Sequence, residues 1–280
     1  MIKSTLMPPL SDLPLARRLE RTEATANAHF VEARARAFPQ SGAQWIEVAG
    51  AYAMFDAVQS PCTQTFGLAL FQMPTPADMD QMEAFFRDRH APILHEVSPL
   101  ADPAILPLLA SRNYHPVELT TVMFLPIADW AAAQTTDSVQ VHPITQTEQE
   151  IWAQTSAAGW SESPEAAAIM QNFGRVAAAT EGYVPFLAEL NAQPIATGGL
   201  AIHEGVALFA GASTIPAWRR HGAQQALLEN RFHYARHAGC DLAMMCTAPG
   251  SASQRNAERQ GFRIAYTRIK WQTIEQNPST

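Results

Sequence analysis

Cysteine is scarce in this chain of 280 residues, which contains only Cys62, Cys240 and Cys246. Three cysteines this far apart provide neither the disulfide framework of a small secreted domain nor the paired spacing of a zinc site. A reducing compartment is the default for such a chain, so we expect a cytoplasmic protein.

Long apolar runs are also missing. No uninterrupted apolar stretch approaches the roughly 20 residues that a membrane-spanning helix needs. Near the N-terminus, Pro8, Pro9 and Pro14 interrupt the apolar residues, so the segment lacks the apolar core of a signal peptide. The sequence therefore predicts no membrane partner.

Positive charge is the third shortage. Lys and Arg number 19 against 26 Asp and Glu, which gives a formal net charge of −7. Such a chain lacks the basic surface that general nucleic-acid binding requires, so we expect no nucleic-acid partner. Apolar residues make up 47% of the chain, enough to build one large domain or two of ordinary size.

The most informative stretch is residues 207–262. An apolar run at residues 207–213 is followed by a basic turn with Arg219, Arg220 and Gly222, and then by a helix-forming run. A strand that turns into a helix leaves several backbone N–H groups unpaired and pointing the same way, which suits a phosphate or pyrophosphate. Gly222 has no Cβ, so the backbone can approach such a ligand closely.

This order of parts resembles the GCN5-related N-acetyltransferases, in which a splayed strand leads into a pyrophosphate loop, Arg/Gln-x-x-Gly-x-Gly/Ala, and then a helix. Residues 219–224, RRHGAQ, match the first Arg and the Gly but have Gln224 where the family has a small residue. Residues 253–262 are similar to the family's short helix ending in Gly-Phe, between strands predicted at residues 242–246 and 264–271. The resemblance covers roughly the second half of the chain.

The resemblance implies acetyl-CoA as cosubstrate and no metal. The splayed strand end would bind the thioester carbonyl, the basic loop the pyrophosphate, and the short helix the pantetheine arm. The last contact has an alternative, because polar residues on a short helix also serve simply as caps or solvated surface. The expected cofactor contacts are Ala212, Ser213, Thr214, Arg219, Arg220, His221, Gly222, Ala223, Gln224, Gln225, Ser253 and Asn256.

Catalytic residues are less clearly marked. The family often carries a Tyr that protonates the leaving thiolate, but Ala257 stands at that position. Tyr266 on the last strand is a substitute acid, although a Tyr on a strand is more often packed in the core. Glu189 lies in an apolar strand and is a candidate base if burial raises its pKa, whereas the alternation of that strand also permits a solvated position. Trp152 and Trp160 either line the acceptor pocket or pack in the core.

The predicted elements indicate an α/β class, with a mixed α+β sheet flanked by helices in each of two tandem acyl-CoA N-acyltransferase-like domains. We expect a first domain at residues 1–127 and a second at 128–280, with residues 128–139 as a linker and residues 1–20 irregular. Helices are predicted at residues 22–37, 77–89, 103–111, 147–158 and 164–180, and strands at 44–56, 65–71, 93–97, 115–126, 139–144, 184–190, 195–202 and 206–213.

The two halves are hypothesised to be repeats. Residues 90–114 can be aligned on residues 237–262 with one gap, at low identity, so that Asn113 falls where Gly261 falls. The first half has prolines and acidic residues, such as Pro76 and Asp78, in place of the basic glycine loop. We therefore expect the first half to have lost cofactor binding.

The predicted function is transfer of an acetyl group from acetyl-CoA to a primary amine of a small molecule or peptide by direct attack. The alternatives are a non-catalytic CoA-binding sensor or regulatory module and, with less support, a protein-interaction domain. The acidic composition favours a cationic acceptor. The sequence leaves the acceptor, the physiological role and the oligomeric state open.

Overall fold

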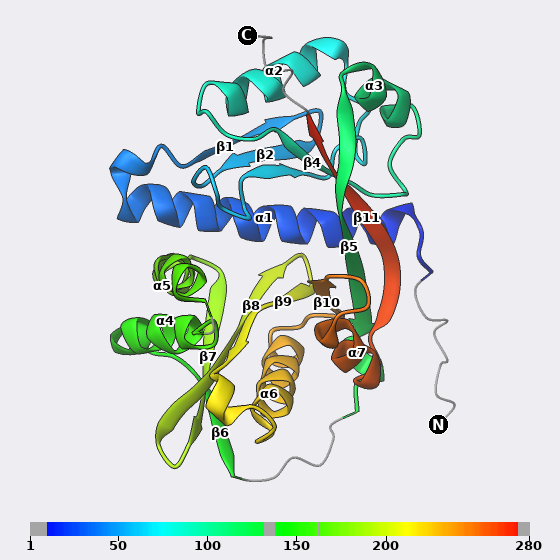
Figure 1. Ribbon diagram of the computed structural model, residues 1–280. Helices are drawn as coiled ribbons and strands as arrows, with labels where there is room; N and C mark the ends of the chain where they lie inside the picture. The colour runs from blue at the N-terminus through cyan, green and yellow to red at the C-terminus, as the bar shows by residue number, and fades with distance from the viewer. Residues whose placement is uncertain (1–9, 132–137, 162, 274–280) are drawn as a thin grey trace, which may run out of the picture.

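The computed structural model describes residues 10–131, 138–161 and 163–273. Within them, strands from both halves form one mixed sheet with helices on both faces (Figure 1). The helices of seven residues or more are α1 (Leu13–Ala37), α2 (Pro76–Arg87), α3 (Ile105–Ser111), α4 (Gln149–Ala158), α5 (Pro164–Ala178), α6 (Ala223–His237) and α7 (Ala252–Arg259). The strands are β1 (Gln44–Val48), β2 (Ala51–Phe55), β3 (Gln64–Phe66), β4 (Leu94–Val97), β5 (Tyr114–Pro126), β6 (Val139–Pro143), β7 (Tyr183–Leu190), β8 (Gln193–His203), β9 (Val206–Thr214), β10 (Leu242–Thr247) and β11 (Arg263–Thr273).

The strand order shows that the two halves share a topology and exchange their last strands. The order is β1-β2-β3-β4-β11-β5-β10-β9-β8-β7-β6, so β11 lies between two strands of the first half and β5 lies beside β10 of the second. From the β1 end, two antiparallel pairings lead to the parallel pairing of β3 with β4. From the β6 end, three antiparallel pairings lead to the parallel pairing of β9 with β10. The similar order of pairings in the two halves supports the repeat hypothesis. The sheet and its helices form the mixed α/β fold expected from the sequence.

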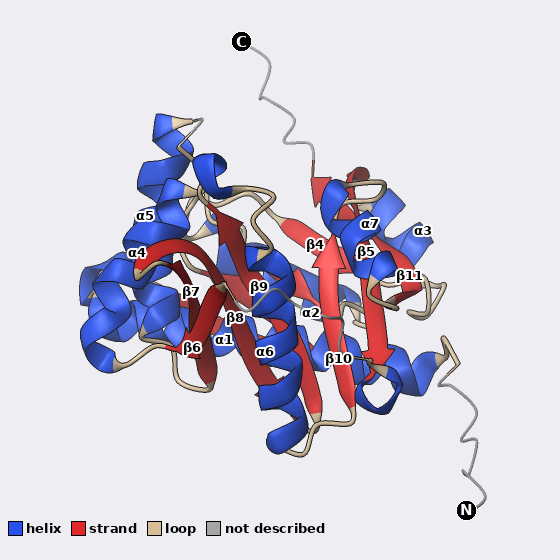
Figure 2. Cartoon of the chain, turned by 90° about the horizontal axis from the view of Figure 1, so that it is seen from below, coloured by secondary structure: helices blue, strands red, loops and turns tan. Residues whose placement is uncertain are grey.

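Helices cover the sheet unequally. The long helix α1 crosses one face and contacts strands of both halves, β1 to β3 and β8 to β9, while α4 and α5 lie on the same side over the second half (Figure 1). Figure 2 shows α6 against the strands of the second half. No helix of the described ranges is both long and apolar enough to cross a membrane.

The start of α1 differs from the prediction that residues 1–20 are irregular. The helix begins at Leu13, because the Asp12 carboxylate accepts a hydrogen bond from the Leu15 N–H at 3.0 Å. Pro14 lies in the first turn, where its missing N–H leaves no intrahelical bond unmade. Residues 1–9 lie outside the described part of the chain, as do residues 132–137 of the predicted linker at 128–139.

Two predicted strands are shorter in the structure. The stretch at residues 44–56 is a hairpin of β1 and β2, in which Ala49 and Gly50 both adopt positive φ angles, 49° and 76°. The stretch at residues 65–71 ends as a strand at Phe66, because Gly67 turns the backbone with a φ of 73°.

A buried ion cluster fastens β11 to the rest of the molecule. The Arg268 side chain is only 2% exposed, and it contacts Glu20 and Glu23 of α1 at 3.1 and 2.5 Å and Glu96 of β4 at 2.6 Å. Burial raises the pKa of Glu20 and raises that of Glu96 to about 7, although Arg268 opposes both shifts. Burial also acts on Glu23, but Arg268 outweighs it and lowers the pKa. One guanidinium therefore stabilises three desolvated carboxylates.

Removing this cation is expected to destabilise the protein strongly. We predict that Arg268→Met lowers the free energy of unfolding by about 3–5 kcal/mol, because three carboxylates lose their buried partner. Without Arg268 the folded-state pKa values of all three carboxyl groups rise, because burial is then unopposed by the guanidinium. Raised folded-state pKa values favour the folded state at low pH and disfavour it as the pH rises. Urea denaturation should therefore show a larger loss at pH 8 than at pH 5.

The control is Arg175→Met, which removes an Arg–Glu150 pair of 2.7 Å on the exposed surface. Water solvates both of these groups in the absence of the pair, so its stability should stay within error of the parent at both pH values. An Arg268→Met variant as stable as this control would contradict a stabilising role for the buried cluster.

Candidate active site at the splayed strands

The central feature of the second half is the separation of β9 from β10. The two strands pair in parallel only from Val206 to Leu208 and from Leu242 to Met244. Beyond these residues β9 keeps its other neighbour, β8, through a bulge, and Gly211 adopts a φ of 64°. The edge of β9 that faces β10 is thus free of a strand partner from Phe209 onward, and its backbone groups are available to a ligand.

A groove of about 820 Å³ occupies this gap on the α6 side. It runs between β9, β10, the first turns of α6 and the short helix α7. Arg231, which is buried on α6, adds a cation to its wall, and burial lowers the pKa of this guanidinium to about 10. Five of the residues expected to contact the cofactor line this groove: Ala212, Gln224, Gln225, Ser253 and Asn256.

The start of α6 has the character of an anion site. α1, α2, α5 and α7 each begin with a side chain that accepts from a first-turn N–H, but α6 begins after Gly222 with no side-chain cap. Gly222 has a φ of 83° and Arg220 one of 69°, so the turn is held in a left-handed conformation. The N–H groups of the first turn, including those of Ala223 and Gln224, have no intrahelical acceptor and carry the positive end of the helix dipole.

The basic residues of the turn lie outside the groove wall. Arg219, Arg220 and His221 are exposed on the segment that leads into α6. The Nδ1 atom of His221 is 3.0 Å from the Arg219 carbonyl, and its ring meets the Trp218 ring edge-on at 5.7 Å. Arg219 and Arg220 therefore place positive charge on the exposed segment directly before the helix.

Gln224, the departure from the family pattern, has a structural explanation. Its Nε2 donates to Thr214 Oγ1 at 2.7 Å and to the Ser213 carbonyl at 3.4 Å, which ties α6 to the end of β9. The Ser213 hydroxyl donates to the Ser156 carbonyl at 2.8 Å on the other side of the strand. The side chains of Ser213 and Thr214 are therefore used within the protein.

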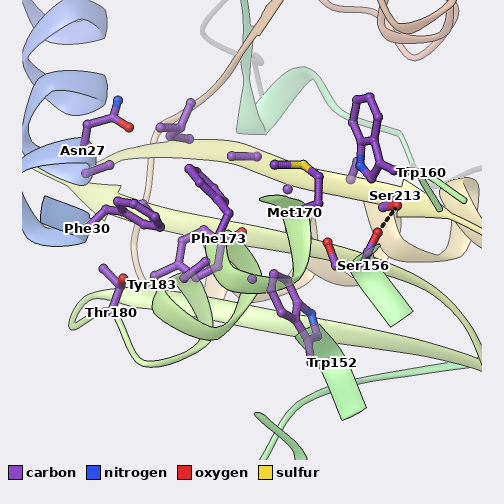
Figure 3. Close-up of a pocket in the computed structure, with 18 residues that line it drawn as sticks. Asn27, Phe30, Trp152, Ser156, Trp160, Met170, Phe173, Thr180, Tyr183 and Ser213 are labelled. Atoms are coloured by element: carbon purple, nitrogen blue, oxygen red, sulfur yellow. Dashed lines mark hydrogen bonds between the residues drawn. The ribbon is translucent and has the colours of Figure 1, made fainter. Parts of the chain in front are cut away.

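An apolar chamber of about 280 Å³ lies on the opposite face of β9, between α1, α4 and α5 (Figure 3). Phe30, Trp152, Met170 and Phe173 contribute to its wall. The chamber and the groove have in common Trp160 and the three β9 residues Ala210, Gly211 and Ala212. The splayed part of β9 is therefore the boundary between them.

A third cavity, a polar cleft of about 340 Å³, meets both of the others. Glu23, Glu96, Glu118, Arg268 and Lys270 supply its charged side chains. The cleft joins the groove at the end of β10, residues 246–248, and joins the chamber at α1 and α5. Three cavities of different chemical character thus converge on the ends of the splayed strands.

Neither predicted catalytic residue faces these cavities. The Tyr266 hydroxyl donates to Glu20 at 2.9 Å on the α1 face, and burial raises its pKa well above the ordinary value. Tyr266 therefore belongs to the buried cluster and lines none of the three cavities. Glu189 is half-buried on β7, beside Gln140 of β6, and lines neither groove, chamber nor cleft. Ala257 is a core residue at the groove wall and has no proton to donate.

Cys246 and Tyr183 carry reactive groups and line these cavities, but burial keeps both groups protonated. The Cys246 thiol donates to Glu23 at 3.3 Å, and burial raises its pKa well above the usual value, so it is neutral. The Tyr183 hydroxyl lies against Gly199 and Gly211, where an added Cβ would come within 1.7 and 2.4 Å of it. Both glycines make room for this hydroxyl at the chamber wall, which sequence reasoning missed.

The contribution of the first half was also missed. Asn27 and Phe30 of α1 line the cleft and the chamber, respectively, and Glu96 and Glu118 reach the cleft from β4 and β5. These residues lie more than a hundred positions away from the glycine loop, and their nearness follows from the strand exchange. Glu20, on the largely apolar buried side of α1, could have indicated a distant contact, because a buried carboxylate requires a partner.

Comparison with known proteins agrees with this geometry. Residues 144–262 match the model of the acetyltransferase (GNAT) family. No curated protein matches the sequence. A GCN5-related N-acetyltransferase from Kribbella flavida has a TM-score of 0.60 at 16% identity, covering 90% of this chain and 96% of that chain.

Two further solved structures are similar over nearly the full length. A tandem GNAT protein from the clavulanic acid biosynthesis pathway has a TM-score of 0.60 at 13% identity, with 98% of each chain covered. A GCN5-related N-acetyltransferase from Sphaerobacter thermophilus has a TM-score of 0.55 at 13% identity, covering 95% of this chain and 93% of that chain. Residues 144–262 therefore match the acetyltransferase (GNAT) family, and the chain as a whole has a tandem GNAT fold.

Proposed function

We propose that the protein is an N-acyltransferase that takes an acetyl group, or a related acyl group, from acyl-CoA and transfers it to a primary amine by direct attack. The observation that carries this proposal is the uncapped start of α6 at the mouth of the groove between β9 and β10. First-turn N–H groups bind the pyrophosphate, the groove takes the pantetheine arm, and the free edge of β9 receives the thioester.

The splayed strand also supplies the electrostatics that acyl transfer needs. When the amine attacks, the N–C bond forms, the carbonyl oxygen gains negative charge, and the C–S bond then breaks. Backbone N–H groups of β9 near Gly211 are preorganised donors for that oxygen. The CoA thiol has a reference pKa of about 8.5, so its thiolate leaves without a dedicated acid at Ala257.

The polar cleft is the proposed entrance for the amine. Arg268 and Lys270 balance Glu23 and Glu118 there, and Glu96, whose pKa is about 7, adds part of a further negative charge, which favours a cationic acceptor. The cleft reaches the end of β10 and therefore the thioester. The amine loses its proton before or during attack, and water in the cleft accepts it. The acceptor class is thus a primary amine on a small molecule or peptide.

The first half has no equivalent anion site. The start of α2 is closed by its own capping box, in which Asp78 accepts from the Thr75 N–H and hydroxyl, both at 2.8 Å. Pro76 removes one further N–H donor. The hydrogen bonds from Thr75 lower the pKa of Asp78, so a fixed negative charge occupies the position that a phosphate would need. The proposal therefore includes one CoA site in each chain.

We expect Gly222→Val to weaken CoA binding at least tenfold. The branched side chain would project at the start of α6, and a φ of 83° is unfavourable for Val. The matched control is Gly239→Val at the other end of α6, where φ is 78° and an added Cβ meets nothing within 4 Å. Both variants carry similar backbone strain. Calorimetry should show weak binding only for Gly222→Val, and equal affinities would place the pyrophosphate elsewhere.

Titration of the full chain with CoA is expected to saturate at one ligand per chain. The same protein should release free thiol from acyl-CoA with at least one member of a panel of mono-, di- and polyamines. A stoichiometry of two would overturn the assignment of the first half. Binding of CoA without thiol release from any amine would favour the alternative function, a CoA-binding regulatory module, for which the absence of a groove acid at Ala257 is the supporting observation.

A further inference from the structure

The apolar chamber is larger than an acetyl group requires. Its volume is about 280 Å³. For comparison, a dry apolar protein cavity of roughly 150 Å³ accommodates benzene. A methyl group at its mouth would leave most of the chamber unfilled, with the surrounding aromatic and aliphatic side chains lacking contact partners. The chamber has room for an alkyl chain of several methylenes or an aryl group.

The position of the chamber connects it to the reacting carbonyl. It opens on Ala210, Gly211 and Ala212, which are also the β9 residues of the groove wall. A thioester bound at this edge, with its pantetheine arm in the groove, directs its acyl carbon toward the other face of the strand. Figure 3 shows the side chains of Phe30, Phe173 and Trp152 gathered around the space on that face.

Three polar side chains of the chamber wall already have partners. Trp152 donates to the Phe186 carbonyl at 2.9 Å, and Thr180 donates to the Val176 carbonyl at 2.8 Å. Ser213 is engaged with Ser156, as described above. No ionisable carboxylate or amine lines the chamber among the described residues, so it offers no opposite charge to an ammonium group. The amine is served by the polar cleft, and the chamber is left for an apolar group.

We infer that the chamber binds the apolar tail of an acyl group longer than acetyl, so that the preferred donor is a medium-chain or aryl acyl-CoA. This inference rests on the proposed function, since it assigns the donor of the same reaction. The balance of the reaction is unchanged: the thioester C–S bond breaks, the amide N–C bond forms, and the proton lost by the amine equals the proton taken up by the CoA thiolate.

The test compares CoA, acetyl-CoA, butyryl-CoA and hexanoyl-CoA with the full chain, first by calorimetry and then by thiol release with a fixed amine. Each methylene moved from water into an apolar site is worth about a fourfold gain. Full burial of the four additional methylenes of hexanoyl-CoA would give about 250-fold. We expect hexanoyl-CoA to exceed acetyl-CoA by at least tenfold in affinity or in kcat/KM. Equal values for the two donors would overturn the inference. Failure of CoA itself to bind would instead overturn the proposed function.

A pair of variants on α5 identifies the cavity responsible. Ala177 lines the chamber, whereas its neighbour Ala178 is equally buried but does not line it. Ala177→Leu should reduce the hexanoyl-to-acetyl ratio at least tenfold, and Ala178→Leu should leave that ratio at the parental value, with thermal unfolding reporting any shared loss of stability. A ratio that falls equally in both variants would contradict the chamber assignment. So would a change in the KM of the amine without a change in the donor ratio, because the chamber would then hold the acceptor.

Discussion

The separation of β9 from β10 is the constraint on which the whole site depends. Unpaired backbone inside a protein is costly, and the sheet tolerates it here because a bulge at Gly211 redirects β9 and Gln224 bonds the Ser213 carbonyl. Because of the same gap, residues of β9 line a cavity on each face of the sheet. The groove lies on the α6 face and the apolar chamber on the α1 face, so the two cavities meet at the splayed part of this strand.

The buried cluster around Arg268 gives the first half a role in that site. β11 lies between β4 and β5, and its guanidinium holds α1 through Glu20 and Glu23. Once α1 is fixed there, Phe30 closes the chamber and Glu23 faces the cleft. In the first half, the Asp78 side chain caps the start of α2. Residues of the first half nevertheless line cavities of the second half. The first half therefore contributes side chains to the chamber and the cleft.

Local features of the sequence were predictable, and long-range ones were not. The turn at Gly222 and the helix that follows it depend on nearby residues, and the structure has both. The environment of Tyr266 depends on α1, which is more than two hundred residues away, so its bond to Glu20 had no signal in its own strand. The half-buried position of Glu189 likewise follows from its neighbours β6 and β8. The exchange of β5 and β11 between the halves determines which residues line each cavity. The apolar periodicity of a sequence does not reveal such an exchange.

The most direct measurement is a crystal structure of the full chain with S-hexyl-CoA, an unreactive thioether that has the reach of a longer acyl-CoA. The account predicts pyrophosphate oxygens within hydrogen-bond distance of the N–H groups that begin α6, the sulfur beside Gly211, and the hexyl tail against Phe30 and Trp152. A pyrophosphate bound away from α6, or a tail extended into solvent with the chamber empty, would contradict it.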